Sequence, residues 1–295
     1  MDEELRGRLR RLLGRDVRPL HATTGGYTHA FREIIELGGG ERAFVKAATD
    51  DTTAEWLRTE HRMYADVAGP FMARVLAFDD GPRPVLVLED LSRAHWPPPW
   101  EPGMAERVMA ALRLVAETDP PAWLPSLESQ RDRLGGWATV ADDPAPFLAL
   151  GLCSAQWLDE SLPSLLAAEA AAVLDGDALV HLDVRSDNLC FDGERTLLVD
   201  WNLPARGNAA FDVAFWLPSL EAEGGPPPEA ILPGEPELAA MVAGFFAARA
   251  GLPVIPHAPR VREVQLQQLR TALPWAARAL GLPPPGGSLA GPPAV

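Results

Sequence analysis

HLDVRSDNLCFDGERTLLVDW, residues 181–201, is the stretch that decides the fold. It opens with the pattern H-x-D-x-x-x-x-N, formed by His181, Asp183 and Asn188, and continues into two short apolar runs separated by an Asp-Gly turn. This order predicts a β-hairpin. The hairpin would bring Asn188, just before its first strand, close to Asp200, just after its second. Oxygen-bearing side chains that converge with room for phosphate and water suit Mg²⁺.

Phosphoryl transfer is the chemistry that fits this set of side chains. One carboxylate accepts the proton of an attacking hydroxyl, while an Asn and a second Asp hold the metal ions that neutralise the nucleotide phosphates. The catalytic loop of protein kinases has the same spacing between its Asp and its Asn. A lone Asp at a strand end is usually a turn or cap residue. Four residues and a hairpin in this order are harder to explain without a function.

The stretch resembles the aminoglycoside phosphotransferase family, which includes choline-kinase-like and other small-molecule kinases. The resemblance implies an α+β, protein-kinase-like, two-lobed fold with a small β-rich N-lobe and a larger, mostly helical C-lobe. It implies Asp183 as the catalytic base, Asn188 and Asp200 as metal ligands, and ATP and Mg²⁺ as cofactors. His181 is expected to pack under the loop as a structural residue. Arg185 would touch phosphate or bridge to a neighbouring carboxylate, and the sequence does not decide which.

Upstream, Lys46 is the only lysine among 26 basic residues, and it lies within an apolar run that predicts a strand. In the family a phosphate-binding lysine stands in a similar F-V-K pattern; the alternative is an edge-strand lysine in solvent. Because side chains alternate along a strand, Phe44 points to the same side as Lys46 and would stack on the adenine. Glu60, on a helix predicted over 53–67, is the expected partner of Lys46. Glu55 is the alternative.

Two further segments complete the predicted nucleotide site. The turn T-T-G-G at 23–26 looks like the family's abbreviated glycine loop, in which Gly25 and Gly26 would lay backbone N–H groups over phosphates. On its own it is a weak signal, because such turns are common. Glu89 and Leu91 lie in the short link between the lobes, where the family's backbone binds the adenine edge. They are assigned by position and not by side chain.

Composition excludes several classes of protein. The chain has 295 residues, 47% of them hydrophobic and 23% charged, which is ordinary for a globular protein. No apolar run approaches the ~18 residues of a membrane span. The net charge of −15 would repel phosphate backbones, so nucleic-acid binding is not expected. The acidity fits a cationic small substrate and a merely soluble protein equally well. Cys153 and Cys190 lack metal-ligand spacing and predict buried thiols in a cytoplasmic protein.

The predicted organisation has three parts. Residues 1–91 form the nucleotide-binding lobe, residues 92–282 form the catalytic and substrate-binding lobe, and residues 283–295 form a disordered Pro/Gly-rich tail. Helices are predicted over about 103–118, 144–151, 161–175, 236–250 and 258–280. Asp212 is expected to open a buried helix and to brace the catalytic loop.

The sequence therefore predicts a small-molecule kinase that transfers the γ-phosphate of ATP to a substrate hydroxyl. Two alternatives stay open: a catalytically inactive nucleotide-binding protein of the same fold, and a Mg²⁺-dependent hydrolase that uses Asp183 and Asp200 and does not need Lys46. Asn202 stands where many family members have an acid after D-W, which leaves the acceptor unidentified. An aromatic wall for a cationic acceptor is one arrangement of Trp96, Trp100, Trp201 and Trp216, although an ordinary core or surface role is favoured for each singly.

Overall fold

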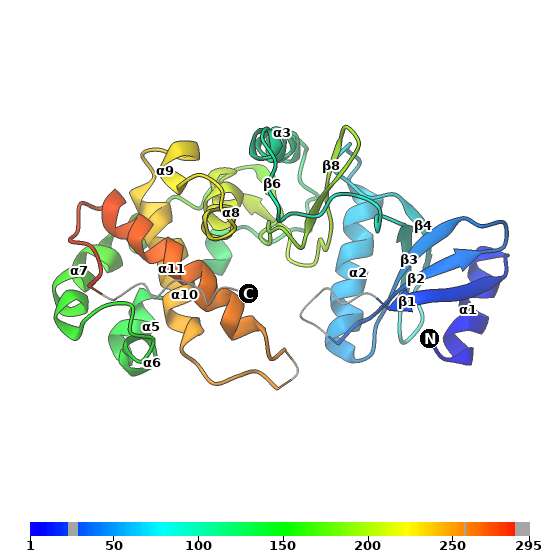
Figure 1. Cartoon of the computed structure of the whole chain (residues 1–295), viewed down its shortest axis with the longest axis horizontal. Coiled ribbons are helices and arrows are strands. Elements are labelled where there is room, and N and C mark those ends of the chain that lie inside the picture. The colour runs from blue at the N-terminus through cyan, green and yellow to red at the C-terminus, as the bar shows by residue number, and fades with distance from the viewer. Residues whose placement is uncertain (23–28, 257, 287–295) are drawn as a thin grey trace. The chain divides into compact units, whose positions relative to one another are not determined.

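The computed structural model describes residues 1–22, 29–256 and 258–286 (Figure 1). By internal contacts the chain forms two compact units, which we call unit 1 and unit 2. Unit 1 contains Met1–Leu124 and His181–Ala205, and unit 2 contains Pro125–Val180 and Arg206–Val295. Unit 1 thus extends past residue 91, the predicted end of the first lobe, and includes the stretch that carries the candidate site.

Unit 1 is built on a five-stranded antiparallel sheet with the strand order β1-β2-β3-β5-β4. Its strands are β1 (Val17–Ala22), β2 (Phe31–Leu37), β3 (Arg42–Ala47), β4 (Val75–Asp79) and β5 (Val85–Glu89). The described residues of the unit also form three helices, α1 (Glu3–Leu13), α2 (Asp51–Asp66) and α3 (Met104–Ala116). The strand predicted around Lys46 and the helix predicted over 53–67 are confirmed as β3 and α2.

The two faces of this sheet bury different helices, and the period of two in the strands explains how. On β5, Val85 and Val87 join a core cluster with Leu9 of α1, whereas Leu86 and Leu88 join a second cluster with α2. A strand covered on both faces reads as a continuous apolar run, as V-L-V-L does here. Figure 1 shows α1 and α2 beside this sheet. Residues of β3 that share the α2 face therefore point toward α2.

The predicted hairpin is β7 (Leu189–Asp192) and β8 (Arg195–Leu198), paired antiparallel. Gly193 at its turn has φ 58°, a conformation that glycine adopts without strain. At the open end the Val199 N–H donates to the Asn188 carbonyl at 2.9 Å. The hairpin is held within unit 1 by a 2.8 Å hydrogen bond from the Leu198 N–H to the Phe71 carbonyl.

Unit 2 is mostly helical (Figure 1). Helix α10 (Pro236–Ala250) packs against α7 (Ala155–Ala171) and α11 (Val261–Ala279), and α11 packs against α8 (Ala210–Ala222). Its short elements are a 3₁₀ turn (Glu128–Gln130), α4 (Arg131–Leu134), α5 (Trp137–Asp142), α6 (Ala145–Leu148), α9 (Pro228–Ile231) and a two-stranded ribbon of β6 (Ala178–Val180) with β9 (Ala205–Gly207).

One predicted helix begins at the wrong residue. The prediction placed it over 161–175, but α7 starts at Ala155 because the Ser154 side chain caps it by accepting from the Trp157 N–H at 3.0 Å. Pro163 lies inside this helix, where proline is normally unfavourable, as it also does in the predicted range. In the part of the chain that the structure describes, no helix is both long and apolar enough to cross a membrane.

Candidate active site

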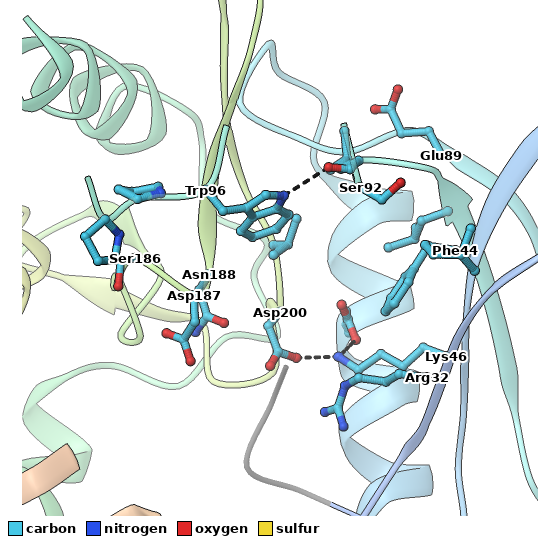
Figure 2. Close-up of a pocket in the computed structure, with 17 residues that line it drawn as sticks. Arg32, Phe44, Lys46, Glu89, Ser92, Trp96, Ser186, Asp187, Asn188 and Asp200 are labelled. Carbon is cyan, nitrogen blue, oxygen red and sulfur yellow. Dashed lines mark hydrogen bonds and ion pairs between the residues drawn. The ribbon is translucent and has the colours of Figure 1, made fainter. Parts of the chain in front are cut away.

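A cavity of about 570 Å³ lies within unit 1, between the α2-facing side of the sheet and the open end of the hairpin (Figure 2). Its lining has an apolar part and a charged part. The apolar part consists of Ile34, Phe44, Leu88, Leu91, Trp96, Pro97, Pro98 and Val199. The other lining residues are Arg32, Lys46, Glu60, Glu89, Ser92, Ser186, Asp187, Asn188 and Asp200. Most of the residues predicted for the site therefore meet at one cavity.

Lys46 lies between two carboxylates. Its Nζ contacts Glu60 Oε2 of α2 at 2.6 Å and also pairs with Asp200 Oδ1, just beyond β8. Lys46 and Glu60 are buried, with 5% and 1% of their surface exposed. Glu55 is on the exposed side of α2. The structure thus selects Glu60 as the partner of Lys46, which spacing alone did not decide.

Lys46 and Asp200 favour each other's charged forms, whereas burial raises the pKa of Glu60 despite the adjacent ammonium. Burial disfavours the charged form of Lys46, but the carboxylates of Asp200 and Glu60 outweigh it and raise the pKa of the ammonium. Burial likewise opposes ionisation of Asp200, yet Lys46 holds the pKa of that carboxyl below its usual range. The cavity therefore carries a fixed ammonium and an ionised carboxylate beside each other at neutral pH.

Asp183 and Asn188 are joined by the loop that precedes the hairpin. The Asn188 Nδ2 donates to Asp183 Oδ2 at 2.8 Å and to the Asp183 carbonyl at 2.9 Å. These bonds use the nitrogen of the carboxamide and leave its oxygen directed elsewhere. Burial raises the pKa of Asp183, against the opposing charge of Arg185. A carboxylate with a raised pKa is a better proton acceptor than an ordinary one.

His181 supports the loop from beneath, as predicted. It is fully buried, its Nε2 bonds the Val199 carbonyl at 3.0 Å, and its Nδ1 accepts from the Asp183 N–H at 3.3 Å. Burial lowers the pKa of His181 to about 4, so the ring is neutral. Trp201 lies 4.3 Å from it, centroid to centroid, and is also fully buried. The D-W pair thus provides one pocket-facing carboxylate and one core side chain that packs on the loop histidine.

The backbone is strained at two points of this loop and hairpin. Leu182 has φ 65° and Asp200 has φ 67°. Both values lie in the left-handed backbone region, which residues other than glycine seldom adopt. Such residues cluster where a particular side-chain direction is required, and each costs about 1–3 kcal/mol. Leu182 directly precedes Asp183, so both strained positions are at or next to predicted site residues.

Arg185 bridges two carboxylates. Its Nε is 3.0 Å from Asp183 Oδ1 and 3.4 Å from Asp187 Oδ1. Of the two roles left open by the sequence, the structure contains the bridge to neighbouring carboxylates. Asp187 directly precedes Asn188 in the sequence and lines the cavity, although it was not predicted as a site residue.

Asn202 has a role that an acid at this position would not have. Its Nδ2 donates to Asp200 Oδ1, the same oxygen that pairs with Lys46. Both bonds therefore fall on Oδ1. No described residue forms a hydrogen bond with Oδ2 of Asp200, so this oxygen is available to a bound ligand.

These oxygens fit a magnesium ion. Within the described part of the chain, no hydrogen bond engages Asn188 Oδ1 or Asp200 Oδ2, the remaining oxygens of the two predicted ligands. Within residues 1–22, 29–256 and 258–286 there is no group of three His, Cys, Asp or Glu side chains that would form an all-protein cage. Mg²⁺ is typically held by one or two protein oxygens together with phosphate and water. Asn188 and Asp200, two oxygen-bearing residues that line one cavity, meet that requirement.

The link after β5 forms the edge of the apolar part. Phe44 and Lys46 share one face of β3, as predicted, and Phe44 packs with Leu88 in the α2-facing cluster. The Glu89 side chain is engaged elsewhere: Oε1 accepts from Arg195 at 2.7 Å and from the Arg74 N–H at 2.8 Å. The Glu89 carboxylate is thus engaged by Arg195 and Arg74, and the assignment of its backbone to the nucleotide remains a prediction.

Other predictions have different outcomes. Gly25 and Gly26 are outside the described residues. Trp201 and Trp216 are fully buried, so they cannot form an aromatic wall facing an acceptor. Trp96 lines the cavity instead. Asp212 is buried in the first turn of α8, and its bracing of the loop remains a prediction.

Arg32, like Asp187, lines the cavity without having been predicted, and Trp96, considered only as part of an aromatic wall, lines it as well. Arg32 is the direct partner of Lys46 across the β2–β3 pair, so both side chains leave the sheet on the same face (Figure 2). A hairpin register extrapolated from the turn would have paired them, but the glycine-rich turn at 38–40 left that register open. Trp96 belongs to a Pro-rich segment without periodicity, which gave no signal of direction.

The fold and the cavity define a protein-kinase-like enzyme of the small-molecule phosphotransferase class. The sequence profile of the phosphotransferase enzyme family matches residues 22–253. The chain belongs to that family, and the fold class and enzyme class predicted from residues 181–201 are confirmed. Comparison with curated proteins finds no match.

Several solved structures share the fold at low sequence identity. A choline/ethanolamine kinase family protein from Mesorhizobium loti has a TM-score of 0.61 at 17% identity, covering 95% of this chain and 97% of the other. A spectinomycin phosphotransferase solved with ADP and spectinomycin has a TM-score of 0.60 at 13% identity, covering 96% and 99%. An aminoglycoside phosphotransferase from Alicyclobacillus acidocaldarius has a TM-score of 0.56 at 14% identity, covering 89% and 91%.

Proposed function

We propose that this protein is an ATP- and Mg²⁺-dependent small-molecule kinase that transfers the γ-phosphoryl group to an acceptor hydroxyl. The observation that carries the proposal is the chain's only lysine, buried between Glu60 and Asp200 at the wall of the cavity. A hydrolase that relied on carboxylates and metal alone would not need this lysine. A phosphate-binding site does, because the ammonium offers a fixed positive charge and donors to the nucleotide.

Each side chain has a proposed part. Lys46 binds the phosphates and is positioned by Glu60. The Asp183 carboxylate accepts the proton of the acceptor hydroxyl, and Asn188 orients that carboxylate through its 2.8 Å bond. A positioned base is typically worth ~10²–10⁴ in rate. Phe44 and the other apolar lining residues would enclose the base of the nucleotide.

Asn188 and Asp200 would hold the magnesium ion, which when bound neutralises phosphate charge that develops during transfer. Lys46 adds its own charge on the same side of the cavity. The charge of Lys46 keeps the Asp200 carboxylate ionised, and the bonds from Lys46 and Asn202 to its Oδ1 fix its direction.

The acceptor is proposed to be a small hydroxyl compound. The solved neighbours include proteins described as a choline/ethanolamine kinase family member and a spectinomycin phosphotransferase, so amino alcohols and aminoglycosides are the first classes to test. The net charge of −15 is compatible with a cationic acceptor.

The test is Mg²⁺-dependent ADP release from ATP across a panel of amino alcohols, sugars and aminoglycosides. Compound-dependent release by the wild type that falls at least a hundredfold in Asp183→Asn supports the proposal. Clear MgATP binding with no release for any compound would support an inactive nucleotide-binding protein. The absence of both turnover and nucleotide binding would refute the proposed function.

A further inference from the structure

In the link after β5, the backbone carbonyl and the backbone N–H of Leu91 differ in their hydrogen bonding. The Leu91 carbonyl accepts two hydrogen bonds, from the Ala94 N–H at 3.0 Å and from the Trp96 indole Nε1–H at 2.9 Å (Figure 2). A carbonyl oxygen has two lone pairs, so this acceptor is saturated. By contrast, no hydrogen bond engages the Leu91 N–H anywhere in the described parts of the chain. Leu91, which lines the cavity, therefore has an unengaged backbone donor and no spare acceptor among the described residues.

The neighbouring groups hold this arrangement in place. The Ser92 N–H donates to Asp90 Oδ1 at 2.8 Å, which fixes the turn that follows Leu91. Trp96 lines the cavity and packs in the cluster that contains Leu91 and Cys190. The indole is thus fixed by packing as well as by its hydrogen bond, and the saturated carbonyl is a stable feature of the fold.

Adenine and guanine place different hydrogen-bond donors and acceptors on the edge that would contact Leu91. Adenine offers an acceptor at N1 and only a carbon-bound hydrogen at C2, which suits a single backbone donor. Guanine offers donors at N1 and at the 2-amino group, and to use the Leu91 N–H through its O6 it would direct these donors at the Leu91 carbonyl. A buried donor left without an acceptor loses binding free energy.

We infer that Trp96, by occupying the Leu91 carbonyl, makes this cavity select adenine over guanine nucleotides. The inference rests on the proposed function, because it concerns the nucleotide that the proposed kinase would use. Trp96 is a specificity-determining residue that acts through Leu91, and it is distinct from the residues proposed for phosphoryl transfer.

The experiment is equilibrium titration calorimetry of the full chain with the magnesium complexes of ATP, GTP and the triphosphate of 2,6-diaminopurine riboside. The third nucleotide keeps the adenine edge and adds a 2-amino donor. Wild-type protein should bind ATP at least tenfold more tightly than GTP. It should gain no more than about twofold from the added 2-amino group, which finds no acceptor. These two comparisons need no variant.

Trp96→Phe keeps an aromatic ring and removes the indole donor. In this variant the preference for ATP over GTP should fall about tenfold, and the diaminopurine nucleotide should bind several-fold more tightly than ATP. The matched control is Trp123→Phe, which also removes one indole hydrogen bond, that to Asp66 Oδ2 at 2.7 Å, but does not line the cavity. Its nucleotide ratios should equal those of the wild type.

The outcomes separate the inference from the proposed function. Equal binding of ATP and GTP by the wild type, or a tenfold gain from the 2-amino group, would overturn the inference while leaving the kinase proposal intact. Ratios that are unchanged in a folded Trp96→Phe protein would also overturn it. If no purine nucleotide binds, the proposed function fails and the inference fails with it.

Discussion

The carboxamide of Asn188 spans the side chain and the backbone of Asp183, with Nδ2 2.8 Å from the carboxylate and 2.9 Å from the carbonyl. This contact makes a proposed metal ligand also the residue that orients the proposed base. The two proposed functions of the loop, proton transfer and metal binding, are therefore coupled through one side chain.

Asp183→Asn should abolish turnover and preserve folding. The amide has the size of the carboxylate but cannot accept the proton, so the rate should fall by ~10²–10⁴. Turnover of the best acceptor and calorimetric binding of MgATP check this together. ATP affinity should stay within about threefold of the wild type; a variant that retains most of its rate would show that Asp183 is not the base.

Lys46→Met should destabilise the protein as well as weaken ATP binding. The substitution leaves Glu60 and Asp200 without their shared cation, and removal of one partner of a buried pair typically costs about 3–5 kcal/mol. Urea unfolding of this variant measures the loss.

The double variant Lys46→Met/Glu60→Leu separates the two effects. Removing both charged groups should restore part of the stability without restoring ATP binding. If the double variant bound ATP like the wild type, Lys46 would have only a structural role.

Asp200→Asn tests the metal site. The wild type should bind ATP much more weakly when Mg²⁺ is removed with a chelator. In the variant the benefit of Mg²⁺ should shrink by about tenfold or more, since even an outer partner of a metal ligand is typically worth 10–100-fold in affinity. Calorimetric titrations with and without Mg²⁺ give this ratio, and an unchanged ratio would remove Asp200 from the metal site.

His181 should make stability depend on pH. Burial lowers its pKa from 6.5 to about 4 in the folded protein. The unfolded chain therefore binds a proton below pH 6.5 that the folded protein refuses until about pH 4. The resulting stabilisation is complete above pH 6.5 and is lost as the pH falls toward 4, by ~3 kcal/mol.

Denaturant titrations of the wild type and His181→Gln at pH 7.5 and pH 5 measure this effect. The wild type should lose more free energy of unfolding than the variant between these pH values. Equal losses in the two proteins would mean that His181 is not held neutral.

Much of this site could be predicted from the sequence because it is local. Asp183, Asn188 and Asp200 fall within one loop and one hairpin, where spacing and the turn determine what meets. Lys46 was identifiable because it is the chain's only lysine and lies in an apolar strand.

The residues that were missed or left open depend on contacts distant in sequence. The choice between Glu60 and Glu55 needed the side of α2 that packs on the sheet. Arg32 needed the exact pairing of β2 with β3, and Trp96 needed the path of a Pro-rich segment without periodicity. For Trp201 and Trp216 the favoured interpretation, a core role, is confirmed, because both side chains are fully buried, and the alternative of an aromatic wall is excluded for these two.

The most direct test of the central claim follows the γ-phosphate of labelled ATP to its product. The wild type, given its acceptor and Mg²⁺, should place the label on the small molecule, and both Asp183→Asn and Lys46→Met should fail to do so. Label that appears only as inorganic phosphate, at a rate that Lys46→Met retains, would contradict the account and show a Mg²⁺-dependent hydrolase.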